Sequence, residues 1–155
     1  MNEPRTPNPE PRNVRLVIEY DGTDFSGWQK QSTRLSVQGE VQRAIQAVTH
    51  EQVRLIGAGR TDAGVHALGQ VASFKTAARL PAERFPAALN AHLPDTIRIL
   101  TAEEAPIDFH ARYSATGRTY RYVILNRPAP SAILRRHAWH VAQPLDLDGM
   151  RRGLD

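Results

Sequence analysis

An arginine and a carboxylate that could act together, Arg60 and Asp62, stand two residues apart in this chain. In an extended loop, residues i and i+2 point to the same side, so both side chains can face one site. Gly59 and Gly64 let the backbone adopt positive φ or approach a ligand closely. A carboxylate beside a fixed guanidinium stays ionised near neutral pH, as a nucleophile must. A surface ion pair in a turn is the alternative interpretation of the same residues.

Apolar runs on both sides of this segment indicate that it connects two strands. Residues 52–56 precede it, and the alternating residues 70–74 follow it. His66 lies four residues after Asp62, where it could contact a phosphate or a ribose, or be hydrogen-bonded within the loop itself. The pattern therefore predicts a functional loop between two strands.

Four stretches resemble, in kind and in order, motifs of the TruA family of tRNA pseudouridine synthases. They are Gly57–Ala67 with Gln70–Phe74, Tyr20–Gln29, Ser36–Glu40, and Phe109–Thr116 with Tyr120–Tyr122. The first is similar to the family's active-site motif, the second to the loop after its first strand, and the third to the start of its first helix. The resemblance covers residues from about 13 to 155.

The resemblance implies that Asp62 is the catalytic aspartate of an enzyme that isomerises uridine to pseudouridine in tRNA. Arg60 would orient Asp62 and assist extrusion of the base, and Tyr120 matches the family's active-site tyrosine. The implied targets are uridines at positions 38–40, in the anticodon stem-loop, and the family works as homodimers. The reaction breaks a glycosidic bond and rejoins the uracil through carbon, so neither a metal nor a redox cofactor is expected.

The net charge of +4 is unevenly distributed. Residues 1–109 carry 12 basic and 13 acidic side chains, whereas residues 110–155 carry eight arginines and three acids. A basic excess in the last third suits phosphate binding. Arg118 and Arg121 are the candidate contacts nearest Tyr120, although strand alternation would place Arg121 on the opposite face from that tyrosine.

Hydrophobic periodicity predicts an α+β fold with the order β-α-β-β-α-β. The strands are expected near 14–20, 52–57 and 69–75 and from 97, and the helices over about 37–48 and 81–92. Ser36 is expected to cap the first helix, whose apolar stripe is Val37, Val41, Ala44, Ile45 and Val48. This order indicates a ferredoxin-like antiparallel sheet with both helices on one face.

Residues 109–155 are expected to begin a second, similar domain. Strands are predicted at 119–125 and around 137–141, followed by a helix with Asp146 or Asp148 as its N-cap. We therefore expect a disordered leader over 1–12, a ferredoxin-like catalytic domain over 13–108, and a truncated second domain over 109–155. Because the resemblance matches one half of the family fold and the start of the other, a fragment without activity is an open alternative.

Composition narrows the other possibilities. The chain has no cysteine, which excludes disulfides and thiolate metal sites. Its six histidines do not form a helical pair, so no metal site is expected. No apolar stretch approaches the roughly 18 residues of a membrane span. These features favour a cytoplasmic protein without a membrane association.

Two other functions fit parts of the pattern. A non-catalytic RNA-binding module would carry exposed aromatic side chains on the two central strands of a ferredoxin-like sheet. A retaining glycoside hydrolase would need a second carboxylate as general acid, and only Asp24 or Asp108 is placed to supply it.

Overall fold

A computed structural model describes residues 9–154 of the chain, so most of the predicted leader at 1–12 lies outside the described residues. The described residues fall into two compact units that divide between Thr116 and Gly117. Within this described part, no helix is both long and apolar enough to cross a membrane.

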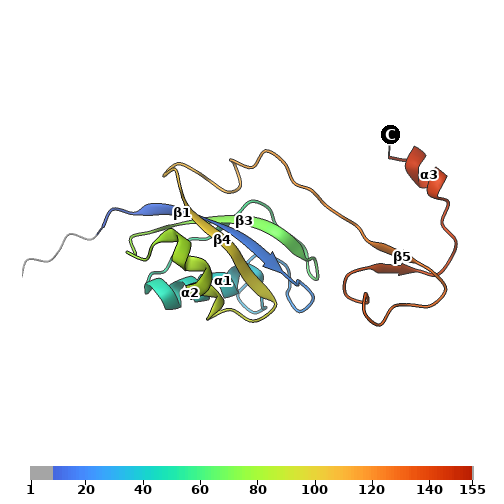
Figure 1. The fold of residues 1–155 in the computed structure, drawn as a ribbon, viewed down its shortest axis with the longest axis horizontal. Helices are drawn as coiled ribbons and strands as arrows, with labels where there is room; N and C mark the ends of the chain where they lie inside the picture. The colour runs from blue at the N-terminus through green and yellow to red at the C-terminus, as the bar shows by residue number, and fades with distance from the viewer. Residues whose placement is uncertain (1–8, 155) are drawn as a thin grey trace, which may run out of the picture. The chain divides into compact units, whose positions relative to one another are not determined.

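The first unit is built on a four-stranded antiparallel sheet (Figure 1). In spatial order its strands are β2 (Ile56–Gly57), β3 (Ala67–Thr76), β1 (Arg12–Tyr20) and β4 (Ile97–Ala105). The central strand β1 pairs with β3 on one side and β4 on the other. The predicted α+β class with an antiparallel sheet is therefore confirmed.

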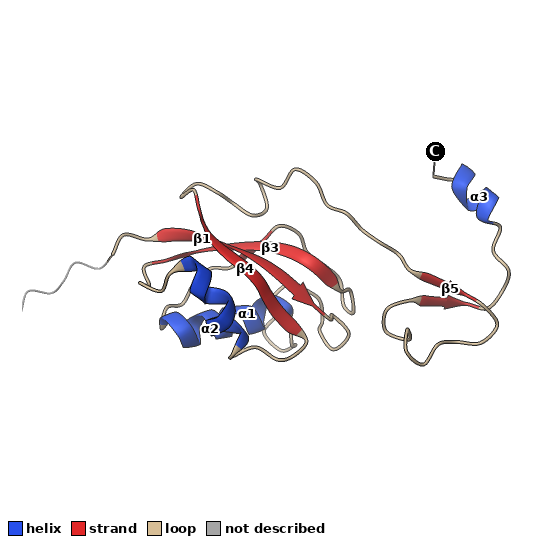
Figure 2. Cartoon of the chain, viewed as in Figure 1, coloured by secondary structure: helices blue, strands red, loops and turns tan. Residues whose placement is uncertain are grey.

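Helices α1 (Val37–Thr49) and α2 (Phe85–Asn90) cover one face of this sheet (Figure 2). A short 3-10 turn, η1 (Ala82–Arg84), leads into α2. Alternate residues of β1 point toward the helices because side chains of a strand alternate between faces. The fully buried core between sheet and helices includes Val14, Leu16, Ile18, Val37, Val41, Ala44, Ile45, Phe85, Leu89 and Ile97.

The start of α1 agrees with the sequence prediction. Ser36 is the N-cap, and its hydroxyl accepts a hydrogen bond from the Gly39 N–H at 3.3 Å. The C-cap of the helix is His50, which adopts the left-handed conformation with φ of 60° and donates its N–H to Gln46 O. Of the predicted apolar stripe, four residues are buried and Val48 packs partly buried against the core.

Two predicted elements of the first unit are shorter than expected. Only Ile56 and Gly57 of the predicted strand 52–57 pair with β3, because the Val53 and Leu55 carbonyls accept hydrogen bonds from glutamine side chains of α1 instead. The predicted helix 81–92 is reduced to η1 and α2. Proline in the first turn of α2 favours a helix start there, and the Asn90 side chain ends the helix by bonding both backbone groups of Ile99 in β4.

The second unit contains β5 (Ile124–Asn126), which pairs in parallel with β6 (Trp139–Val141), and the helix α3 (Leu147–Arg152). The predicted strand 119–125 is therefore wrong over most of its length. Its partner β6 offers only three residues, and backbone groups without a partner strand do not form a ladder. Asp146 caps α3 as predicted, accepting from the Gly149 N–H at 2.9 Å. None of the described residues 117–154 is buried.

Candidate active site

The loop between β2 and β3 carries Arg60 and Asp62, and both side chains are exposed to solvent. Thr61 between them points the other way, with its Oγ1 2.8 Å from the hydroxyl of the buried Tyr20. Alternation along an extended backbone therefore places the arginine and the carboxylate on the outer side of the loop. Among the described residues, no hydrogen bond or ion pair joins Arg60 to Asp62. Orientation of Asp62 by Arg60 stays a prediction.

A second loop, residues 21–28 after β1, holds the backbone around Asp62. The Trp28 N–H donates to Thr61 O at 3.0 Å, and the Gly64 N–H donates to Phe25 O at 3.3 Å. Both contacts lie within two residues of Asp62. The carboxylate therefore extends from a backbone that is fixed on either side, which is what a positioned nucleophile requires.

Close packing between the two loops depends on glycine. A Cβ on Gly22 would lie 1.9 Å from Val65 O, and a Cβ on Gly57 would lie 2.6 Å from the Trp28 ring. Trp28 is only 1% exposed, and its buried indole packs against Gly57, directly before the loop. The sequence allowed positive φ or close approach to a ligand at Gly59 and Gly64; Gly64 has φ of +79°, whereas Gly59 is not among the described glycines with positive φ.

His66 closes the far end of the loop. Its Nδ1 accepts a hydrogen bond from the Gly22 N–H at 3.1 Å and lies 3.1 Å from Asp21 Oδ1. Asp21 in turn accepts from the Thr23 N–H at 3.0 Å. The geometry makes His66 an anchor between the two loops, which is the structural alternative that the sequence had left open. Its contact with phosphate or ribose stays a prediction.

Sequence reasoning did not single out Tyr20, Thr61 or Gly22 as parts of the site. The signal for Thr61 was its place between two outward-facing residues, because the middle residue of such a triplet faces inward. The contact of Gly22 with Val65 joins residues far apart in the sequence, and no local pattern indicates it. Asp21 and Trp28 lie in the stretch Tyr20–Gln29 that resembles the loop after the family's first strand, and in the structure they contact His66 and Thr61.

The remaining predicted site residues, Arg118, Tyr120 and Arg121, belong to the second unit. All three are exposed, and Tyr120 is 63% accessible. Arg60, Asp62 and His66 thus lie in one loop of the first unit, whereas the tyrosine and its two neighbouring arginines lie in one segment of the second unit. A tyrosine accessible on its surface is suited to stacking against a base.

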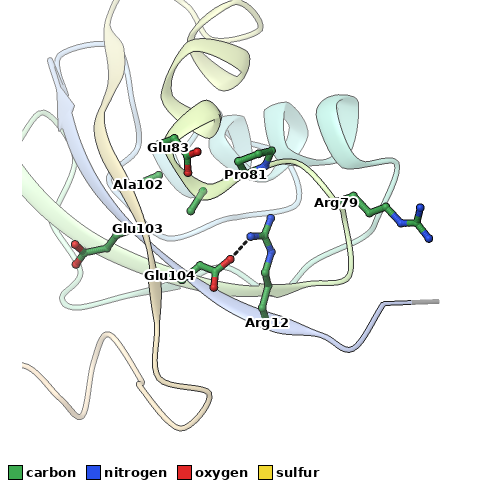
Figure 3. A pocket seen from close by; sticks show the side chains of 8 residues that line it. Arg12, Arg79, Pro81, Glu83, Ala102, Glu103 and Glu104 are labelled. Carbon is green, nitrogen blue, oxygen red and sulfur yellow. Dashed lines mark hydrogen bonds and ion pairs between the residues drawn. The ribbon is translucent and has the colours of Figure 1, made fainter. Parts of the chain in front are cut away.

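A cavity of about 480 Å³ lies elsewhere in the first unit (Figure 3). It opens beside Arg12, at the beginning of β1, whereas the Asp62 loop contacts Tyr20 at the end of the same strand. Arg12 is hydrogen-bonded to Glu104 within it. The lining therefore contains an arginine neutralised by a neighbouring glutamate, and it contains none of the predicted site residues. Over the described residues 9–154, no group of three His, Cys, Asp or Glu side chains could hold a metal ion.

Fold and loop together define an α+β unit that presents a backbone-fixed aspartate and an arginine, and comparison with known proteins identifies the class. A family model described as tRNA pseudouridine synthase matches residues 16–114, which include the second half of β1, strands β2 to β4 and the Asp62 loop. The chain belongs to this tRNA pseudouridine synthase family.

Individual relatives narrow the similarity to one branch of that class. The chain is 55% identical over 141 residues to tRNA pseudouridine synthase A of Acetivibrio thermocellus, covering 91% of this chain and 58% of that protein. It is 51% identical over 144 residues to tRNA pseudouridine synthase A of Caldicellulosiruptor bescii, covering 93% and 59%. It is also 51% identical to tRNA pseudouridine synthase A 2 of Clostridium tetani, covering 90% and 57%. The resemblance to the TruA family is confirmed, and the chain spans less than two thirds of the length of these relatives.

Proposed function

We propose that this protein is a tRNA pseudouridine synthase in which Asp62 is the nucleophile. The observation that carries the proposal is the geometry of the loop between β2 and β3. An exposed carboxylate projects from a backbone that Trp28 and Phe25 hold on either side of it. This loop also lies within the segment that the family model matches.

Pseudouridine formation requires few catalytic groups beyond such a carboxylate. Breaking the N-glycosidic bond of uridine leaves positive charge on the sugar, which a nearby carboxylate stabilises or traps, as in retaining glycosidases. The uracil then turns over and is rejoined through carbon, without loss of any group. Asp62 would supply the carboxylate, and the exposed Arg60 would orient it and occupy the space left by the extruded nucleotide.

The target uridine must leave its stack before reaction, at a cost of a few kcal/mol. In our proposal Tyr120 packs against the flipped base, and Arg118 and Arg121 contact phosphates. The exposure of all three residues supports this role. His66, which anchors this loop to loop 21–28, would contribute to substrate binding by keeping the loop in place.

The substrate and the assembly belong to the same proposal. The relatives are named for tRNA, and their similarity supports tRNA as the substrate. We propose positions 38–40 of the anticodon stem-loop as the targets, as the motif resemblance implies. We further propose a homodimer in the cytoplasm that acts without a cofactor. The sheet order β2-β3-β1-β4, with both helices on one face, supports a ferredoxin-like catalytic domain over 13–108. The parallel pair β5–β6 would begin a second such domain over 109–155.

A purely RNA-binding module is less well supported. It would present aromatic side chains on the two central strands, as in RNP motifs. In the structure the aromatics of those strands, Tyr20 and Phe74, are 3% and 1% exposed and face the core. The unusual exposed residues lie instead in the loop beside β3.

The decisive experiment is pseudouridine formation in an unmodified tRNA transcript, comparing the chain with Asp62→Asn. Asp24→Asn is the matched control, because Asp24 is another exposed carboxylate in the neighbouring loop 21–28. We expect Asp62→Asn to lower turnover by about 10³-fold or more, and Asp24→Asn to leave it within about threefold. Equal activity of all three proteins would exclude Asp62 as the nucleophile.

If the 155-residue chain shows no turnover, the same three sequences are compared after extension with the C-terminal region of the Acetivibrio thermocellus relative. Activity that then depends on Asp62 supports the proposed function. An extended protein that folds, binds tRNA and forms no pseudouridine would overturn it.

A further inference from the structure

Between Trp28 and the helix cap Ser36, seven consecutive residues are exposed. They are Gln29, Lys30, Gln31, Ser32, Thr33, Arg34 and Leu35. The segment, called here the 29–35 loop, contains two cations and no carboxylate. All of its side chains except Leu35 can donate a hydrogen bond.

The two ends of the 29–35 loop are fastened together. The Ser26 N–H donates to Leu35 O at 2.9 Å, and the Gln38 N–H donates to Trp28 O at 3.0 Å. A loop with adjacent, hydrogen-bonded ends is an Ω-loop, a type that is frequently functional. Because its base is already ordered, binding through this loop costs less conformational entropy than binding through a free strand.

The base of this loop is also the support of the proposed catalytic loop. The Trp28 N–H donates to Thr61 O, directly before Asp62, and Lys30 follows only two residues later. Two residues span at most about 7 Å, so the backbone of Lys30 lies within the length of one or two nucleotides from any sugar bound at Asp62. Gln38 also joins the 29–35 loop to the segment before β2, since it accepts from the Lys30 N–H and donates to Leu55 O, both at 2.8 Å.

The cations of the 29–35 loop are available for a ligand. Within the described residues, the Lys30 ammonium and the Arg34 guanidinium have no hydrogen-bond or ion-pair partner. Elsewhere in the first unit, Arg15 pairs with Glu103 at 2.5 Å, and a hydrogen bond from Arg43 to Glu40 raises the pKa of that guanidinium. The loop thus keeps positive charge unneutralised beside the site.

An anion near this loop would be held by side chains rather than by the helix. The amides in the first turn of α1 already have acceptors, supplied by Gly27 O, Trp28 O and both oxygens of Ser36. The aliphatic stem of Lys30 lies over Gly39, where a Cβ would be 3.8 Å from Lys30 Cγ. Lysine binds phosphate as a point charge, so the exposed Lys30 can hold an anion without the helix amides.

We propose that the 29–35 loop grips the phosphate backbone of the RNA substrate beside the target uridine, through Lys30 and Arg34. The inference rests on the proposed function, because it places an RNA sugar at Asp62. Backbone contacts of this kind fix the register of an RNA without reading its sequence. They would hold the nucleotides that flank the flipped uridine.

The test is the salt dependence of binding to a labelled anticodon stem-loop RNA, measured by fluorescence anisotropy on the 155-residue chain. The loop variant is Lys30→Gln with Arg34→Gln. The control is Arg79→Gln with Arg84→Gln, which removes the same charge from two exposed arginines that form no ion pair with any described residue. Arg79 follows Ala78, whose carbonyl binds Arg12 at the opposite end of β1 from the site.

Each phosphate contact contributes about 0.7 to 0.9 to the slope of log K against log salt concentration. We expect the loop variant to lower that slope by about 1.5 and the affinity at low salt by about tenfold or more, and the control to keep the wild-type slope. Equal slopes for the two variants, or no binding of this RNA by the wild-type chain, would overturn the inference.

Failure of the proposed function would look different. If Asp62→Asn leaves turnover unchanged while the loop variant shows a weaker salt dependence of RNA binding, Asp62 is not the nucleophile but the loop still binds RNA. In an active, extended protein, the loop variant should raise KM with little change in kcat, because the contacts hold ground state and transition state alike. A loss of kcat at unchanged KM would contradict this role.

Discussion

Replacing Gly22 by alanine tests how the two loops are held together. The new Cβ would lie 1.9 Å from Val65 O, whereas real contacts of this kind are essentially never below 3.0 Å. The backbones of residues 22 and 65 must therefore separate by more than about 1 Å. A shift of this size also breaks the 3.1 Å hydrogen bond from the Gly22 N–H to His66 Nδ1.

The expected loss of stability follows from these contacts. Overpacking against backbone costs about 1–3 kcal/mol, and the lost hydrogen bond costs about 1 kcal/mol. Reduced freedom of the unfolded chain offsets about 0.4–1 kcal/mol. The free energy of unfolding should therefore fall by about 1–3.5 kcal/mol.

Gly69→Ala is the matched control, because its Cβ would meet only Val17 Cγ1 at an ordinary 3.8 Å. This change should alter stability by less than about 1 kcal/mol, toward greater stability. The assay is urea unfolding followed by tryptophan fluorescence in a Trp139→Phe background, so that the signal comes from the buried Trp28. Midpoints for the two variants should differ by about 1–2 M urea. Coincident midpoints would refute the packing of loop 21–28 on residue 65.

Two further changes test single hydrogen bonds, and both are measured by the same unfolding assay. Ser36→Ala removes the side-chain cap of α1 and should lower the free energy of unfolding by about 1 kcal/mol. Its control is Ser32→Ala in the exposed loop nearby, which should change stability by less than about 0.5 kcal/mol. Equal effects of the two changes would contradict the capping role. Thr61→Val removes the 2.8 Å hydrogen bond to Tyr20 and should cost about 1 kcal/mol, whereas Thr61→Ser keeps the hydroxyl and should lose less. A serine variant no more stable than the valine variant would show that this bond does not hold the loop.

The elements predicted correctly are those that local rules specify. The stripe of α1 repeats at helical spacing, and Ser36 offers a hydroxyl where the first turn needs an acceptor. A strand was expected near 14–20, and in β1 the alternate residues Leu16, Ile18 and Tyr20 are buried. The outward placement of Arg60 and Asp62 also follows from the chain itself, because neighbouring side chains of an extended segment point to opposite sides. Family membership likewise came from short motifs and their order.

Errors arose where distant residues decide the outcome. The strand predicted at 52–57 is shorter in the structure because side chains of α1 donate hydrogen bonds to its carbonyl groups. The strand predicted at 119–125 is shorter because β6 pairs with only three residues, Ile124–Asn126. The hydrophobic periodicity of a strand does not indicate how long its neighbouring strand is.

The sequence by itself determined the candidate nucleophile, the helix that follows the first loop, and the family. Only the tertiary structure showed that Gly22 touches Val65, that Tyr20 holds Thr61, and that Trp28 supports both loops. These contacts join segments about 40 residues apart, and they form because a hydrogen-bond donor or a missing Cβ in one loop meets its complement in the other. Side-chain type and spacing are local properties, whereas complementarity between surfaces exists only after the chain has folded.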